Sequence, residues 1–304
     1  NVKIFEKSVF PGGRISRFRV NEYEFNHGAQ YFTVNNPLFW NIVSAWQTEG
    51  IVRPWDGWIV ELHKGQVMNS DMATQRFVGV PRMQKVVENL ARHCSLVTST
   101  NIAELERQTE GGWRLFNERG DYQGAFDIVI IATASHQVSN LCPAIPAISK
   151  AAEGVDMTVC WSAMLAFEQP LNLPYDAAHV LDSPLSWISR YQMAESAHSA
   201  DCWVLHASPE WSLQYAASFR GRVMHAMLDA FWEATDLSER KLVGSAVHCW
   251  KHAVPINPIS EDSLFVEAEA IGACGDWCTA PRIEGAVLSG FSMADRIMKF
   301  VNKS

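Results

Sequence analysis

Residues 274–280 near the C-terminal end of the chain combine a carboxylate with a tight turn. Gly275 and Asp276 follow a short apolar stretch and precede a long apolar helix expected from Gly285. A carboxylate in such a turn can accept hydrogen bonds from hydroxyl groups, and the first N–H groups of a helix carry partial positive charge without an internal partner. Together they suit a ligand with sugar hydroxyls and an electron-rich ring. Asp is also a common turn and N-cap residue, so this pattern alone is weak evidence for a binding site.

Three short segments near the N-terminus contain residue types suited to a nucleotide. Residues 2–5 predict a strand, and Glu6 at its end could accept hydrogen bonds from ribose hydroxyls. Arg14, in the glycine-rich loop 11–16, could contact phosphate, although a salt bridge within the loop would explain it equally well. Residues 25–32 mix small, polar and aromatic side chains, as expected where backbone passes close to a flat ring.

Metal chemistry is a poor interpretation of the remaining patterns. His248 and His252 lie four residues apart, which on a helix would suggest a metal pair, but the β-branched and aromatic residues around them favour a strand. Cys274 and Cys278 have no second pair at ligand spacing. Seven scattered cysteines form no paired framework and are typical of reduced thiols in a cytoplasm. We therefore predict a cytoplasmic protein with no bound metal.

Composition excludes several functional classes. A formal net charge of −8 argues against a nucleic-acid partner, which normally requires a basic surface. No apolar run reaches the length of a membrane span, and no signal peptide precedes the first predicted strand. The 304 residues are enough for two lobes, and nothing in them indicates an oligomeric state.

The order of predicted elements indicates an α/β fold. A continuous apolar run at 128–132 is typical of a parallel strand buried on both faces, and it leads into Thr133. Hydrophobic periodicity predicts helices at 83–93, 223–232 and from 285, and strands at 96–98, 102–107, 113–116, 159–167 and 203–207. We expect one lobe from residues 1–37, 81–140 and 265–304, and a second lobe from residues 38–80 and 141–264.

In this order and spacing, the segments resemble the FAD-dependent amine-oxidase superfamily, and most closely its renalase-like branch. The resemblance runs over nearly the whole chain. It rests on the strand and acid of 2–7, the Gly-Gly-Arg loop of 11–16, residues 25–32, Val80-Pro81-Arg82-Met83-Gln84, residues 126–133, 182–187 and 203–208, and the Gly-Asp-Trp-Cys block. It implies a Rossmann-like FAD-binding lobe and a second, mixed α+β substrate lobe, with FAD between them.

The resemblance also implies roles for individual residues. Asp276 would hold the ribityl chain of FAD, Gln30 would bond the flavin edge, and His248 would orient the substrate; a purely structural role for His248 is equally compatible. Tyr31 and Phe32 could instead belong to the core, and Asn26 stands where the family often has Asp. The implied cofactor-binding residues are Glu6, Lys7, Gly12, Gly13, Arg14, Gly28, Ala29, Gln30, Tyr31, Phe32, Thr133, Gly275, Asp276, Arg282, Glu284, Gly285 and Ala286.

By the same resemblance, the chain is an FAD-dependent oxidase of a small cyclic donor. Hydride passes from the donor to flavin and then to O2, giving hydrogen peroxide. Dihydronicotinamide isomers of NAD(P)H, the donors of bacterial renalases, are the leading substrates, and an amine remains an alternative. A different alternative is a non-catalytic protein that cannot hold FAD.

One part of the family pattern has no counterpart in this sequence. Family members begin with a strand, a G-x-G-x-x-G turn and a helix, together roughly 30 residues. The motif occurs nowhere in this chain, which starts at the next strand of the pattern. Because the first strand is central in the usual 3-2-1-4-5 order, we expect its two neighbours to be unpaired here. We expect the natural fold to include this element ahead of Asn1, and the 304 residues alone to purify without flavin and to be poorly soluble.

Overall fold

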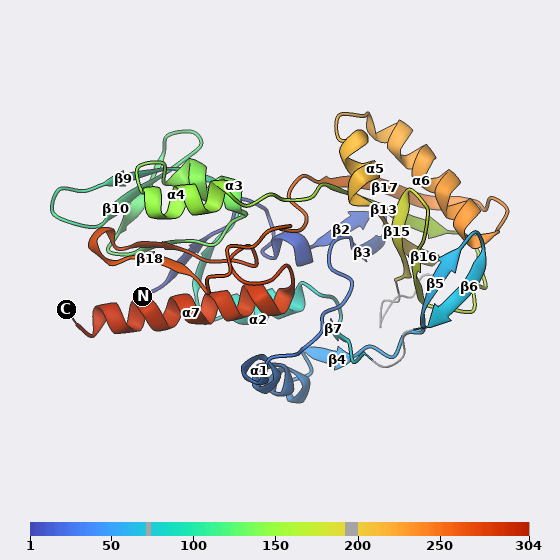
Figure 1. The fold of residues 1–304 in the computed structure, drawn as a ribbon, viewed down its shortest axis with the longest axis horizontal. Helices are drawn as coiled ribbons and strands as arrows, with labels where there is room; N and C mark the ends of the chain where they lie inside the picture. The colour runs from blue at the N-terminus through green and yellow to red at the C-terminus, as the bar shows by residue number, and fades with distance from the viewer. Residues whose placement is uncertain (71–73, 192–199, 304) are drawn as a thin grey trace.

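The computed structural model describes residues 1–70, 74–191 and 200–303. Figure 1 shows two lobes joined through the middle of the molecule, with both chain ends in the lobe that contains α7 (Ile283–Val301). The other lobe is built around a seven-stranded sheet. The α/β architecture predicted from the sequence is therefore observed.

The first lobe contains two small sheets with parallel pairings. Its elements are β1 (Lys3–Phe5), α2 (Lys85–Ala91), β8 (Ser95–Val97), β9 (Ile102–Arg107), β10 (Trp113–Asn117), β11 (Tyr122–Phe126), β12 (Val129–Ile131), α3 (Ser135–Leu141), α4 (Pro146–Glu153), β18 (Leu264–Val266) and β19 (Ile271–Ala273). β1 pairs with β8 in parallel, and β12 pairs with β19 in parallel. Among the described residues no strand joins the β1–β8 pair to the β12–β19–β18 sheet.

Helices α3 and α4 cover the β12–β19 sheet. Val138 and Ile148 from these helices pack with Ile131 and Ile271 in one buried cluster. This cluster also contains Val155, so the chain up to about this residue packs with the first lobe. The sequence analysis had assigned residues from 141 onward to the second lobe. The apolar stretches around Pro143 and Pro146 are too short to show a helical periodicity, so the sequence did not indicate which lobe these residues join.

The second lobe is a mixed sheet in the order β17-β13-β16-β15-β14-β5-β6. Its strands are β5 (Ile59–His63), β6 (Gln66–Ser70), β13 (Cys160–Phe167), β14 (Ala177–Val180), β15 (Leu185–Arg190), β16 (Asp201–Ala207) and β17 (Leu242–Trp250). The inner strand β13 is apolar along most of its length, as expected for a strand with both faces covered. Helix α6 (Arg220–Thr235) covers one face, with Val223, Met227 and Phe231 in the main core. Helix α5 (Pro209–Gln214) lies beside it.

The opposite face of this sheet is covered by the hairpin of β2 (Arg17–Val20) and β3 (Tyr23–Asn26). Phe25 of β3 packs on Met164 and Val204. Residues 27–32 follow directly, so the hairpin holds this predicted ligand segment against the second lobe.

A further buried cluster lies at the start of α7. It includes α1 (Pro37–Thr48), β4 (Val52–Pro54) and β7 (Phe77–Gly79). Phe39 and Val43 of α1 pack with Phe77, and Val287 of α7 lies against the same cluster. Residues 37–54 therefore connect α7 to the rest of the molecule. In the described part of the chain, no helix has the length and apolar character to cross a membrane.

Candidate functional site

A bidentate ion pair joins the two ends of the chain at the predicted site. Both terminal nitrogens of Arg14 donate to the carboxylate of Asp276, at 2.6 and 2.7 Å, and Nη1 of Arg14 also donates to the carbonyl of Ala253 at 2.9 Å. Asp276 is buried, whereas the Arg14 side chain is 35% exposed. The glycine-rich loop, the turn before α7 and the segment after β17 therefore meet at one point, and one side of the guanidinium remains accessible.

The turn and helix that carry Asp276 are tightly packed. The N–H of Gly275 donates to Ser289 Oγ on α7 at 2.9 Å. A Cβ on Gly285 would lie 2.1 Å from the carbonyl oxygen of Ala280, so only glycine fits there. Because the first intrahelical bond of α7 runs from the Ala286 N–H to the Arg282 carbonyl, the preceding N–H groups lack helical partners. These N–H groups could receive an electron-rich atom of a ligand.

Glu284 is occupied by the protein itself. Its Oε1 accepts the backbone N–H groups of Asn35 and Asn36, and its Oε2 lies 3.2 Å from Arg282 Nε. The residue is only 2% exposed. The structure therefore gives this carboxylate a clamping role between α1 and α7. Any contact of Glu284 and Ala286 with a ligand would have to come from the backbone.

Glu6 lies at the carboxyl end of the parallel strand β1, as the sequence predicted. Its backbone pairs with Val97 and Thr100, and its Oε1 accepts the Ser8 N–H at 2.8 Å. No hydrogen bond to Oε2 is present among the described residues. The carboxylate therefore has acceptor capacity for ribose hydroxyls, and the exposed Lys7 follows it.

Residues 28–32 form the chain segment that runs between the two lobes, here called the passage. The carbonyl of Arg14 accepts the Ala29 N–H at 3.0 Å, and a Cβ on Gly28 would meet that carbonyl oxygen at 2.0 Å. The Gln30 amide donates to the carbonyls of Asn26 and Gly28 and accepts from Ser189 Oγ. Gln30 thus fastens the passage to the second lobe, and its polar atoms are already engaged.

Tyr31 and Phe32 point to different environments. Tyr31 stacks on Trp55 with ring centroids 5.5 Å apart and lies 5.7 Å from the Trp187 ring. Phe32 is buried against Phe77 and belongs to the core beside α1. Phe32 is therefore a core residue, which is the alternative that the sequence had left open for it.

A narrow cavity of about 50 Å³ opens beside Gln30 on the second-lobe side. Its lining includes Trp55, Arg53, Asp176 and Tyr191. Arg190 in the same lining is paired with Asp176 and Asp201, but Arg53 makes no ion pair within the described residues. An aromatic ring and an unpaired cation therefore face this cavity together.

His248 lies in a cluster of aromatic rings under the passage. Its ring is 4.9 Å from His27 and 4.4 Å from Trp250, edge to face in both cases. Burial lowers the pKa of His248, and Arg220 lowers it further. The neighbouring His27 is buried, and this burial, with His248 nearby, lowers its pKa to about 3. These imidazoles are neutral at pH 7, which suits packing and hydrogen bonding rather than proton transfer.

The segment around His248 is the predicted strand, β17, which ends at Trp250. His252 lies beyond its end and stacks on His136 at a centroid distance of 3.4 Å. The two histidines therefore belong to different clusters. No group of three or more His, Cys, Asp or Glu in the described ranges could hold a metal ion.

Sequence reasoning missed three contributors to the site. Ala253 accepts from Arg14 through its carbonyl, and Trp250 Nε1 and His206 Nε2 both lie 3.2 Å from the carbonyl of His27. The Ala253 carbonyl has no side-chain pattern by which to recognise it. Trp250 and His206 lie in predicted strands, but their contact with His27 depends on the pairing register of the sheet, which the sequence does not reveal.

Thr133, another predicted site residue, lies at the end of β12 and is exposed. Its carbonyl accepts Trp277 Nε1 at 3.1 Å, which links β12 to the Asp276 turn. Gly12 and Gly13 form the start of a single 3-10 turn that positions Arg14. The structure thus brings Arg14, Ala29 and Asp276 together, whereas Phe32 lies in the core and several polar atoms of the other predicted residues already bond to the protein.

Comparisons with known proteins agree with this architecture. A family model described as an NAD(P)-binding Rossmann-like domain matches residues 1–46. A putative protoporphyrinogen oxidase from Exiguobacterium sp. 255-15 is 11% identical with a TM-score of 0.77, covering 98% of this chain and 92% of that chain. A putrescine oxidase with redesigned cofactor binding is 10% identical with a TM-score of 0.72, covering 97% and 93%.

An oxidoreductase from Methanosarcina mazei is 11% identical with a TM-score of 0.70, covering 97% of this chain and 94% of that chain. At these identities the likeness concerns the fold. The chain has the mixed α/β fold of these oxidoreductases, with a Rossmann-like first lobe.

Proposed function

We propose that this chain is an FAD-dependent oxidoreductase of the renalase-like kind that oxidises a dihydronicotinamide donor with O2. The observation that carries the proposal is the junction of Arg14, Asp276 and Ala253, which brings a glycine-rich loop and a helix N-terminus together between the lobes. Its place in a fold shared with oxidases supports the proposal.

The chemistry of the available groups fits FAD. Glu6 has acceptor capacity at the end of β1, where ribose hydroxyls would need it, and Asp276 offers a buried carboxylate to the ribityl hydroxyls. Lys7 and Arg14 are cations placed for phosphate oxygens. Close backbone packing at Gly28 and Gly285 fixes the two segments that we propose to lie along the flat ring. These residues offer partners for the hydroxyls and phosphates of FAD.

When bound, FAD would supply the redox chemistry by accepting hydride from the donor and passing the electrons to O2, which yields hydrogen peroxide. The chain would hold the donor and exclude water. Trp55 and Tyr31 form an aromatic wall beside the cavity, and Arg53 provides a cation without an ion-pair partner in the described part of the chain. This combination suits a flat ring attached to an anionic nucleotide.

The state of the histidines supports a donor that needs no protein base. His27 and His248 are both held neutral by burial, which lowers the pKa of each. Loss of hydride from a dihydronicotinamide gives an aromatic pyridinium directly, without removal of a proton by the protein. The neutral histidines can therefore orient neighbouring groups without titrating during the reaction.

The test is a peroxide assay on the chain supplied with FAD. Dihydronicotinamide isomers of NAD(P)H should produce hydrogen peroxide in equal amount to donor consumed. Putrescine serves as a representative amine. Peroxide from putrescine but not from the dihydronicotinamides would replace the proposed donor with an amine. No peroxide from either class, with FAD bound, would contradict an oxidase function.

A further inference from the structure

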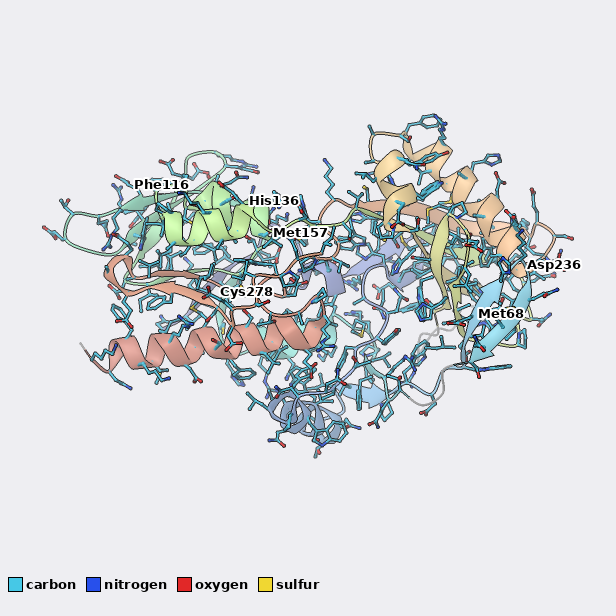
Figure 2. The ribbon with its side chains drawn as sticks, in the orientation of Figure 1. Met68, Phe116, His136, Met157, Asp236 and Cys278 are labelled. Atoms are coloured by element: carbon cyan, nitrogen blue, oxygen red, sulfur yellow. The ribbon has the colours of Figure 1, made fainter. Side chains whose placement is uncertain are left out.

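Two histidines from distant parts of the sequence stack face to face beside the proposed cofactor site. The rings of His136 and His252 have centroids 3.4 Å apart and an interplanar angle of 22°. His136 lies at the start of α3, on the side nearest the other lobe (Figure 2), and His252 follows β17. Nδ1 of His136 is buried and makes no hydrogen bond. A buried polar atom without a partner requires an explanation, because it is costly to leave unsatisfied.

The histidine pair lies in a positive field. Lys7 lowers the pKa of both histidines, and Lys251 and Arg14 also lower that of His252, after the larger effect of burial. Neither lysine pairs with a carboxylate within the described residues, although the chain as a whole carries −8. Arg14 is paired with Asp276, so Lys7 and Lys251 are the cations of this group that lack an ion-pair partner in the described part of the chain. Cations without a counter-charge attract an anion.

The location of the cluster identifies the kind of anion. Lys7 directly follows Glu6, the carboxylate proposed for the adenosine ribose, and Arg14 holds Asp276, the carboxylate proposed for the ribityl chain. Arg14 donates to the carbonyl of Ala253, the residue that follows His252, and the charge of Lys7 acts on both histidines. The pair therefore lies near both proposed sugar contacts. In a flavin dinucleotide, the group between the ribose and the ribityl chain is the diphosphate.

We propose that Lys7, His136, Lys251 and His252, with Arg14, form the binding site for the diphosphate of the dinucleotide. This inference rests on the proposed function and names side chains of this chain as its phosphate ligands. The diphosphate places negative charge among the cations and offers an acceptor to an imidazole N–H. The stacked rings then separate, and the unpartnered Nδ1 of His136 gains access to a donor or acceptor.

A bound anion also changes proton binding. Its charge favours the protonated form of the neighbouring imidazoles, so binding raises the pKa of His252, whose value without ligand is about 4. Binding of FAD therefore takes up protons, and it becomes tighter as the pH falls below the raised pKa of His252. A site built from lysines alone would not take up protons on binding FAD, because the diphosphate diester of FAD does not titrate near neutral pH.

The experiment is isothermal calorimetry of the full chain with pyrophosphate, FAD and riboflavin, performed in buffers of different ionisation enthalpy. The variants are Lys251→Gln and His252→Asn. Lys150→Gln removes a charge from α4 at a position that is exposed, as Lys251 is, and is the matched control. We expect each variant to weaken pyrophosphate and FAD by roughly 3- to 30-fold, as for charge-assisted bonds at a partly exposed site. Riboflavin, which has no phosphate, should bind each variant as it binds the parent.

The probes separate this inference from the proposed function. Saturable pyrophosphate binding that is weakened in Lys251→Gln and His252→Asn but kept in Lys150→Gln, together with proton uptake on binding FAD, supports the diphosphate site. FAD binding that is unchanged in both variants overturns the site while leaving the flavoprotein assignment intact. Absence of pyrophosphate binding by the parent chain also overturns the site. Pyrophosphate binding without any flavin binding would keep the anion site and contradict the proposed function.

Discussion

At the residue scale, the account depends first on Asp276. Its carboxylate makes a buried bidentate pair with Arg14 and is proposed to accept ribityl hydroxyls. Asp276→Ala should weaken FAD binding by roughly 10- to 100-fold, because hydrogen bonds to a charged group contribute about 1.5–3 kcal/mol. Flavin fluorescence during titration measures the dissociation constant. Asp295→Ala, an exposed change on the same helix, should leave it unaltered. Equal affinity in the Asp276 variant and its control would remove Asp276 from the site.

A second residue-scale prediction concerns acid sensitivity. Burial lowers the pKa of His27 from its ordinary 6.5 to about 3, with His248 and His206 contributing. Between these values the unfolded chain binds more protons than the folded chain, so the unfolding free energy falls as the pH falls. The slope for this group is about 1.4 kcal/mol per pH unit. Above about pH 6.5 the group contributes no pH dependence.

The corresponding measurement is the unfolding midpoint from about pH 7 to 4. His27→Asn removes the titrating group. The unfolding midpoint of this variant should therefore fall less between pH 7 and pH 4 than that of the parent. His225→Asn, at an exposed position on α6, should keep the parent slope. A profile for His27→Asn that is parallel to that of the parent would show that other groups govern acid unfolding.

How much of the site could be predicted varied with the residue. Glu6 and Asp276 stand next to predicted strands and turns, so local pattern placed them correctly at strand ends. Tertiary contacts decided the rest. The side-chain oxygen of Gln30 accepts a hydrogen bond from Ser189, which lies 159 positions away, and no local pattern in the sequence predicts that contact. His252 has its partner at His136 for the same reason.

At the element scale, Glu284 determines how α7 meets α1. Its carboxylate accepts the N–H groups of Asn35 and Asn36, and Asn36 in turn caps α1 through the Leu38 N–H. Glu284→Ala would leave two partly buried N–H groups without their partner. We expect a loss of about 2–4 kcal/mol in unfolding free energy.

Thermal unfolding checks the Glu284 prediction. The midpoint of Glu284→Ala should fall by several degrees, and Glu284→Gln, which keeps an acceptor oxygen, should recover part of the loss. Unchanged midpoints in both variants would mean that water replaces the carboxylate. The helix itself was predictable from its apolar periodicity, but this clamp was not, because the sequence favoured a cofactor role for Glu284.

At the scale of the whole molecule, the fold prediction is confirmed in outline. The α/β first lobe and the mixed second lobe are both present, and the same fold occurs in oxidases of about 10% identity. Long apolar runs such as β13 made the strands visible in the sequence. The sequence did not show to which lobe a short helix such as α4 belongs, because a helix of about two turns has little hydrophobic periodicity.

The central claim is that this chain binds FAD between its lobes, and an equilibrium titration of the chain with added FAD tests it most directly. Quenching of flavin fluorescence and the shift of flavin absorbance would be followed to saturation, with Asp276→Ala titrated in parallel. The account predicts saturation at one FAD per chain for the parent and clearly weaker binding for the variant. Absence of saturable binding by the parent, or identical binding by both proteins, would contradict it.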